Sequence, residues 1–471
     1  MVHARSAPSR RKDAVLGLRL QRLRMLGGSF TAVAVVFLLF AELFFFGGDR
    51  LEVALFFAAA QLIGLGLLII FAPWVRGALA RSDFLLAPGA LFMVVMAWSV
   101  IQIAPLPWLA PPHAWAYVEG RDQISIDSYR TLAEILKLAG LAGLTLIGVA
   151  IGKDDDRAHL LWNTIGVLGS IYVGWVLFDY FQPLVGAGPP RGKLTATLGG
   201  ANAAATMLTI FVVVAWTALL RAAVSLTHQS FSGDRLSAAL YAAAPWALLL
   251  LLSLGALSLT GSRGGAGACF VGLLASTAIM VWGEYRNRRA LILIGAATLL
   301  AMACFIILVM SSGATAARLS HVDDALANRR EIISIYWSQL PNLPWTGFGL
   351  GTFRRFNNLL VAPGQNEVLW NLGALHNVFL QWIFEAGYIG AAAMFGAIAM
   401  MVLTTLGGLR RRRFGRTWIA GSIAITAVVV SHGLIDFGLQ LPAIAAFWGL
   451  ALGVGVGVSR PPARSSSSAR D

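Results

Sequence analysis

The sequence predicts an all-α integral membrane protein, and three observations favour this class. Of 471 residues, 58% are hydrophobic and 12% are charged, whereas ordinary soluble domains have roughly 25% charged residues. A hydrocarbon layer about 30 Å thick needs roughly 20 apolar residues per helix, and about 12 such runs fit along the chain. Arginine and lysine gather in the short loops that join alternate runs, as they do on the cytoplasmic side of membrane proteins.

The predicted transmembrane helices are distributed over two regions, with a long insert before the tenth helix. Their expected ranges are 27–47, 51–72, 84–104, 130–151, 160–181, 200–222, 238–259, 264–282, 290–310, 374–406, 417–435 and 437–457. The domain organisation predicted from these ranges is a basic cytoplasmic N-terminus (1–26), helices 1–9 (27–310), a periplasmic loop (311–373), helices 10–12 (374–457) and a disordered cytoplasmic tail (458–471).

The charge distribution predicts which side each loop occupies. The N-terminus is rich in arginine and precedes a long apolar run with no small-residue cleavage site, so we expect an uncleaved first helix. Both termini and the basic loops should then face the cytoplasm, with the polar motifs on the outer face of the membrane. The net charge of +14 is explained by this topology and by contact with anionic membrane lipids. We expect no nucleic-acid partner.

The insert at 311–373 is long for a loop without a function. Within it, the stretch "DALANRREIISIYWSQL" has helical spacing and predicts an amphipathic helix at the membrane interface. The residues expected on its shared apolar side are Ile332, Ile333, Tyr336, Trp337 and Leu340. The following "PNLPWTGFGLGTF" contains the Pro and Gly residues of a turn, with close backbone approach, that covers another part of the protein.

Arg263, Arg329 and Arg330 are the candidate anion-binding residues. Arg263 stands among glycines in "LTGSRGGAG" at the outer junction of two spans. Its planar group of donors suits phosphate or carboxylate, although a packing motif of small residues with a snorkelling arginine is the alternative. Arg329 and Arg330 are expected to open the amphipathic helix. A positive pair is unfavourable there for the helix dipole, which favours an anionic partner, although a solvated charge pair is the simpler interpretation.

His376 is the candidate catalytic base because imidazole can take and return a proton near neutral pH. It stands at the start of the tenth span, where an interfacial histidine bonded to a backbone carbonyl is the alternative, with Asn377 as helix cap. Glu385 follows nine residues later, on the opposite face of a regular helix and about 13 Å deeper. We therefore expect Glu385 to have a structural role in the bundle.

Further outer-face groups are weaker candidates for substrate binding. They are Arg191, Asn202, His432 and Asp436. The last two are four residues apart and would share a helix face; hydrogen bonding between helix ends is the preferred interpretation. A metal site needs a third or fourth ligand, and no further ligand cluster accompanies His432 and Asp436. We therefore expect no metal and no cofactor. Cys269 and Cys304 are expected in spans, as packing residues.

Six stretches in this order resemble the O-antigen ligase and O-antigen polymerase superfamily of bacterial membrane glycosyltransferases. They are "ISIDSYRTL", "KLTATLGGANAAA", "LTGSRGGAG", "NRREIISIYWSQLPNLPWTGFGLGTF", "HNVFLQWIFEAGYIG" and "HGLIDFGLQLPA". The resemblance covers about residues 120–450. It implies a C-type glycosyltransferase-like fold and transfer of a glycan from undecaprenyl pyrophosphate, outside the inner membrane, to an acceptor glycan or lipid A core.

The resemblance also implies roles for individual residues. Arg263 matches the arginine that holds pyrophosphate, Arg329 matches the arginine that opens the loop helix, and His376 matches the histidine that activates the acceptor hydroxyl. Arg330 and Asn377 are then substrate-binding candidates. The stretch "GGANAAA" replaces the asparagine-proline-asparagine run of relatives, which weakens a role for Asn202. A transporter or flippase of a polysaccharide precursor is the alternative function, although no internal repeat supports it.

Overall fold

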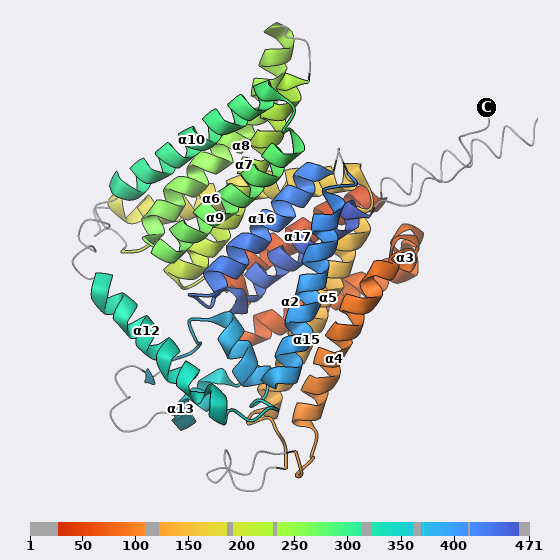
Figure 1. Ribbon diagram of the computed structural model, residues 1–471, viewed down its shortest axis with the longest axis vertical. Coiled ribbons are helices and arrows are strands. Elements are labelled where there is room, and N and C mark those ends of the chain that lie inside the picture. The colour runs from red at the N-terminus through yellow and green to blue at the C-terminus, as the bar shows by residue number, and fades with distance from the viewer. Residues whose placement is uncertain are drawn as a thin grey trace, which may run out of the picture.

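The computed structural model describes residues 27–109, 122–185, 192–228, 233–311, 322–360, 369–370, 372–412 and 415–460. Within these ranges every regular element is a helix (Figure 1). Ten of the described helices are long and apolar enough to cross a membrane. Their positions agree with ten of the predicted spans, which confirms the class of all-α membrane protein.

The first half of the bundle contains the helices up to α8. Their bounds are Gly27–Phe44 for the first helix, then η1 Phe46–Gly48, α2 Leu51–Phe71, α3 Pro73–Ala80, η2 Asp83–Leu85, α4 Leu86–Ile103, α5 Ser128–Gly152, α6 Asp155–Val185, α7 Ala201–Thr227 and α8 Gly233–Thr260.

The second half includes the insert and the helices on either side of it. Their bounds are α9 Arg263–Gly283, α10 Arg288–Ser311, α12 Val322–Gln339, η4 Leu340–Asn342, α13 Phe353–Leu360, α15 Val378–Gly408, α16 Arg416–Gly433, η5 Gly438–Gln440 and α17 Pro442–Ser459. Helices α10 and α16 occupy the remaining two predicted spans but are not among the ten. The total of twelve spans stays a prediction.

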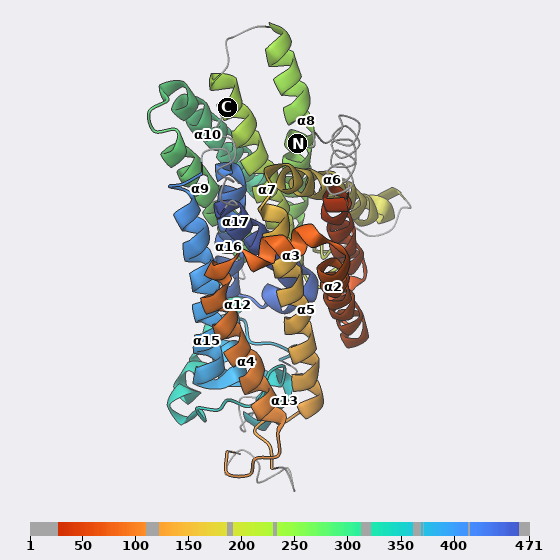
Figure 2. The same ribbon diagram turned by 90° about the vertical axis from the view of Figure 1, so that its right-hand side faces the viewer.

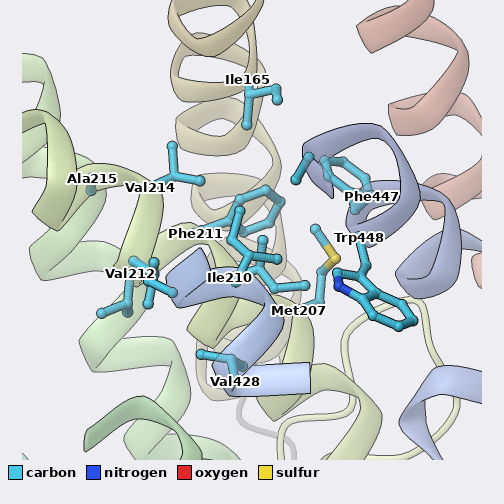
Figure 3. Packing of buried hydrophobic residues seen from close by; sticks show 14 of the residues in the cluster. Ile165, Met207, Ile210, Phe211, Val212, Val214, Ala215, Val428, Phe447 and Trp448 are labelled. Atoms are coloured by element: carbon cyan, nitrogen blue, oxygen red, sulfur yellow. The ribbon is translucent and has the colours of Figure 1, made fainter. Parts of the chain in front are cut away.

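Helices α7 and α17 form the centre of the bundle, and 89% of the apolar window of each is buried. In the core between them, Phe211 of α7 meets Phe447 of α17 edge to face, with ring centroids 5.9 Å apart (Figure 3). Phe211 also stacks on Phe40 of the first helix at 5.8 Å. These aromatic contacts join elements from both halves of the chain around one core.

A row of glycines lets α17 approach α5 closely. A Cβ atom at Gly453 would lie 2.2 Å from the carbonyl oxygen of Thr145, and one at Gly457 would lie 2.3 Å from that of Val149. Gly148 of α5 faces Leu450 in the same way. Small residues four apart are the usual means by which membrane helices bring their backbones together.

The insert folds onto one end of the bundle, where α12 and α13 lie beside the start of α15 (Figures 1 and 2). Ile332 and Tyr336 of α12 are buried in a small apolar core that includes Phe356 of α13 and Phe384 of α15. Trp337, however, is 66% exposed. The prediction of one apolar side was therefore wrong for Trp337, because the buried positions of α12 are spaced by four and leave it outside this core.

The stretch "PWTGFGLGT" pairs with a break in α15. Gly387 has φ +67°, and its amide region contacts the backbone at Gly347, which itself has φ +72°. Phe348 and Gly349 donate their backbone N–H groups to the carbonyls of Phe384 and Glu385 at 3.0 and 2.9 Å. The sequence predicts that this turn covers another part of the protein without naming that part; the structure shows that the turn packs on the break in α15, which was expected to be a regular helix.

Candidate functional site

His376 lies immediately before α15, where its ring is 21% exposed. The helix begins after Asn377, whose side-chain oxygen accepts the backbone N–H of Leu380 at 2.9 Å. His376 Nδ1 lies 3.3 Å from Asp436 Oδ1, and its ring packs on Phe437 at 5.3 Å between centroids. Since a carboxylate accepts, Nδ1 carries the proton, and Nε2 is the nitrogen left with a lone pair.

Asp436 lies in the segment between α16 and η5 and is 1% exposed. Its second oxygen, Oδ2, is buried without a hydrogen-bond partner among the described residues and lies 3.9 Å from His432 Nε2. Burial alone raises the pKa of the Asp436 carboxyl, but the hydrogen bond from His376 and the nearby His432 outweigh it and lower the pKa below its ordinary value. The carboxylate is therefore ionised at neutral pH.

His432, at the end of α16, links Asp436 to two further helices. Its Nδ1 lies 2.7 Å from the hydroxyl of Thr206 in α7. On the other side it meets Gly264, where a Cβ atom would lie 3.0 Å from His432 Nε2. The prediction for His432 and Asp436 assumed one helix face. Helix α16 ends at Gly433, so Asp436 lies in the turn just beyond the helix, with Oδ2 3.9 Å from His432 Nε2.

Arg263 is the first residue of α9, and it is exposed. Ser262 caps this helix by accepting the backbone N–H of Gly265 at 3.1 Å and donates its hydroxyl to Asn202 Oδ1 at 2.8 Å. Asn202 thus holds the start of α9 against the start of α7. Because Gly264 contacts His432, the N-terminus of α9 lies directly beside the His376–Asp436–His432 group.

Arg329 is half-buried and Arg330 is exposed, both on α12. The charge of Arg329 is the smallest of the influences on His432, after burial and the Asp436 carboxylate. Neither arginine opens its helix, because α12 begins at Val322. The prediction of two arginines at a helix start was therefore wrong, and the helix-dipole argument for an anionic partner does not apply. Arg191 lies outside the described residues.

Glu385 lies apart from His376 and organises the insert. Its carboxylate accepts the backbone N–H groups of Gly351 and Phe353, both at 3.1 Å, at the start of α13. Gln381 donates to it at 2.9 Å. Gln381 also accepts the backbone N–H of Leu375 at 2.9 Å, directly before His376. Gln381 is already conspicuous in the sequence as a polar residue inside an apolar run, but its partners are seen only in the structure.

One large cavity opens beside this group. Its volume is about 1920 Å³, and His376, Phe437, Gln381 and Glu385 contribute to its wall. Arg263, Arg329 and His432 are not among its lining residues. His376 thus lies between the cavity and the group that contains His432 and the start of α9.

Within the ranges that the structure describes, no three His, Cys, Asp or Glu residues are grouped closely enough to hold a metal ion. Cys269 is buried with a free thiol. The described groups at the site therefore offer a polarised imidazole, a buried carboxylate and nearby arginines, which suit proton transfer beside an anionic substrate.

Part of the chain is similar to a known protein family. Residues 248–395 match a family model described as O-antigen ligase. This segment covers less than half of the chain; it runs from α8 into α15 and contains Arg263, Arg329 and His376, while His432 and Asp436 lie beyond it. No curated protein matches the chain. The matched domain and the ten helices long and apolar enough to cross a membrane indicate a multi-pass membrane protein, and the match supports the O-antigen ligase and polymerase superfamily and a glycosyltransferase-like enzyme.

Proposed function

We propose that this enzyme transfers a glycan from undecaprenyl pyrophosphate to the hydroxyl of an acceptor sugar, as an O-antigen polymerase or ligase. The observation that carries the proposal is the hydrogen bond between His376 Nδ1 and the buried Asp436 carboxylate, 3.3 Å long. It fixes the imidazole tautomer with Nε2 free to accept a proton, which is the arrangement that a general base requires.

The proposed step is a direct displacement at the anomeric carbon. The acceptor hydroxyl gives its proton to His376 Nε2 while its oxygen forms the new glycosidic bond. The bond from the anomeric carbon to the pyrophosphate oxygen breaks, and lipid pyrophosphate leaves with the electron pair. One displacement inverts the anomeric centre. A positioned base of this kind is worth roughly 100- to 10,000-fold in rate.

The arginines provide the electrostatic stabilisation in the proposed mechanism. Arg263 at the start of α9 and Arg329 on α12 would bind the pyrophosphate, with Arg330 beside them. Negative charge builds on the leaving group as the sugar bond breaks, and fixed cations near a partly dehydrated surface stabilise it. We propose that they do so without a divalent metal. The site would face the periplasm, with both termini in the cytoplasm.

A transfer assay in membrane vesicles tests the proposal. With lipid-linked oligosaccharide as donor, His376→Ala and Arg263→Ala should each abolish most glycan transfer, while Arg76→Ala, on the distant α3, should not. Undiminished transfer in both site variants would refute the mechanism. A ladder of repeats would identify a polymerase, and transfer of one block to lipid A core would identify a ligase. Lipid flipping that survives loss of His376, without transfer, would favour a transporter.

A further inference from the structure

Three basic side chains gather at the end of the bundle opposite His376. Helices α5 and α17 begin near the site and end here, where Lys153 directly follows α5 and Arg460 directly follows α17. Arg81 lies in the link between α3 and α4, and Figure 2 shows α3 and α13 near opposite ends of α4. Three separate parts of the chain thus bring positive charge to one place, away from the residues proposed for catalysis.

The ring of Phe84 holds two of these cations together. Lys153 Nζ lies 4.5 Å from the centroid of this ring, and the guanidinium carbon of Arg460 lies 5.9 Å from the same centroid. Lys153 Nζ also donates a hydrogen bond to the backbone carbonyl of Arg460 at 2.8 Å. An aromatic ring attracts a cation within about 6 Å of its centroid, so the two charges are fixed side by side.

The positive charges of this group repel one another. Lys153 is half-buried, and burial, together with the charges of Arg460 and Arg81, lowers the pKa of its ammonium group to about 8. All three side chains are therefore still positively charged at neutral pH. Like charges held close together are unfavourable unless an anion neutralises them.

No carboxylate neutralises the group among the residues that the structure describes. Asp154 follows Lys153 in the sequence, but it accepts the backbone N–H groups of Asp156 and Arg157, both at 3.1 Å. Its other oxygen lies 3.8 Å from the Arg157 guanidinium. Asp83 in η2 is exposed and forms no ion pair with any described residue. The counter-charge for the group must therefore come from elsewhere.

Most hydrogen-bond donors of the group are also unused within the described part of the chain. The Arg460 guanidinium donates to none of the described residues. Arg81 uses only Nε, which donates to the carbonyl of Gly77 at 2.9 Å. Lys153 uses one of its three N–H groups, for the Arg460 carbonyl. Ammonium and guanidinium donors that converge in this way suit the oxygens of a phosphate.

The surroundings of the group favour a lipid as the source of that phosphate. Phe71, the last residue of α2, is 75% exposed, and Leu86, the first residue of α4, is 73% exposed. Apolar side chains at the ends of membrane helices face the acyl chains of lipids. Basic pockets between helix ends, at the level of the headgroups, are typical sites for anionic phospholipids.

We propose that Lys153, Arg81 and Arg460 form a phosphate-binding site for the headgroup of an anionic phospholipid. This site is separate from the proposed glycan transfer, and its ligand is not consumed. It joins the end of α5 to the end of α17 and to the link before α4. Bound phosphate should therefore stabilise the contact between α5 and α17, where glycines of α17 bring the two backbones together.

The experiment measures the midpoint of thermal unfolding of the purified full-length protein in detergent while a probe is added. The probes are cardiolipin, phosphatidylglycerol, phosphatidylcholine and inorganic phosphate, each tested alone. A ligand that binds only the folded state raises the midpoint as its concentration rises. We expect a rise with the two anionic lipids. Phosphatidylcholine, which carries a phosphate but no net charge, should give none.

Variants of the basic residues locate the binding. Lys153→Gln with Arg460→Gln should need about tenfold more cardiolipin for the same rise, which corresponds to about 1.4 kcal/mol of binding. Arg81→Gln with Arg460→Gln should show a similar loss, and it keeps the hydrogen bond from Lys153 to the backbone in case the first variant does not fold. The control is Arg288→Gln with Arg289→Gln, an exposed pair at the start of α10, which removes the same charge and should respond as the native protein does.

Two results would overturn the proposal. An equal response to cardiolipin in the native protein and in both double variants of the site would show that these residues do not bind the headgroup. An equal loss in the Arg288 and Arg289 control would show that only the net charge of the protein matters. If inorganic phosphate alone gives the full rise, the phosphate site stands, but its ligand is soluble and the lipid part of the proposal fails.

Discussion

At the scale of single residues, the proposed mechanism gives Asp436 the role of orienting His376 for proton transfer. Because the pKa of Asp436 is lowered from its ordinary value of 3.8, its side chain stays ionised from neutral pH down to below pH 3.8. The stability and orientation that it provides are therefore fully present above that value and are lost as the pH falls through the pKa of the folded state. Loss of activity at pH 5–6 would accordingly not reflect protonation of Asp436.

Asp436→Asn should lower the rate of glycan transfer by about 100- to 10,000-fold with little change in protein yield. The amide can present its NH₂ group to Nδ1, which favours the wrong imidazole tautomer. The measurement is the initial rate at saturating donor at pH 7. Asp122→Asn, an exposed aspartate before Ile124, is the control. An Asp436→Asn enzyme within twofold of the native rate would show that His376 does not depend on this carboxylate.

Gly264 has a role that follows from one close contact. An added Cβ atom would lie 3.0 Å from His432 Nε2 and 2.9 Å from Ile435 Cδ1, so Gly264→Ala should displace His432 from Asp436. We expect about a tenfold loss of transfer rate. Gly267→Ala on the same helix is the matched control, because its Cβ atom meets nothing within 4 Å. Equal rates in the two variants would argue against this contact.

At the scale of elements, Glu385 joins the insert to α15. Three donors converge on its carboxylate, from Gly351, Phe353 and Gln381. Glu385→Gln replaces one acceptor oxygen by an NH₂ group that faces backbone donors, which should cost about 1–3 kcal/mol. Faster limited proteolysis of residues 322–360 in detergent would reveal the loosened insert. Glu331→Gln, an exposed residue of α12, should leave the cleavage rate unchanged; equal cleavage in both variants would contradict this role for Glu385.

The elements also show what the sequence could and could not predict. Apolar runs of about 20 residues identify membrane helices because lipid requires each span to satisfy its own backbone. The pairing of His376 with Asp436 could not be predicted in the same way, since the residues are 60 positions apart and meet only through the fold-back after α16. The break at Gly387 could not be predicted either, because a glycine within an apolar run is compatible with a continuous helix.

Arg329 and Gln381 illustrate two limits of sequence-based prediction at this scale. Arg329 was expected at a helix start, but helix ends cannot be read reliably where no cap residue marks them, and α12 begins seven residues earlier. Gln381 is recognisable in the sequence as a polar residue of an apolar run, but the sequence does not show what it binds. Its bond to the backbone of Leu375 depends on how the chain enters α15, which only the structure shows.

At the scale of the whole molecule, the bundle depends on the contact between α5 and α17. Both helices line the large cavity, and α17 begins directly after the segment that contains Asp436 and η5. The close approach of their backbones at Gly453 and Gly457 therefore fixes the position of His376's partner relative to the cavity. A substitution in this contact should disturb stability and activity together.

Gly453→Val provides the corresponding test. Its Cβ atom would lie 2.2 Å from the backbone oxygen of Thr145, and a backbone atom cannot move aside as a flexible side chain can, so we expect a loss of about 3 kcal/mol or more. The measurement is the midpoint of thermal unfolding in detergent. Gly64→Val on α2 is the control, because its Cβ atom meets nothing within 4 Å. If both variants unfold at the same temperature as the native protein, close packing of α5 on α17 does not limit the stability of the bundle.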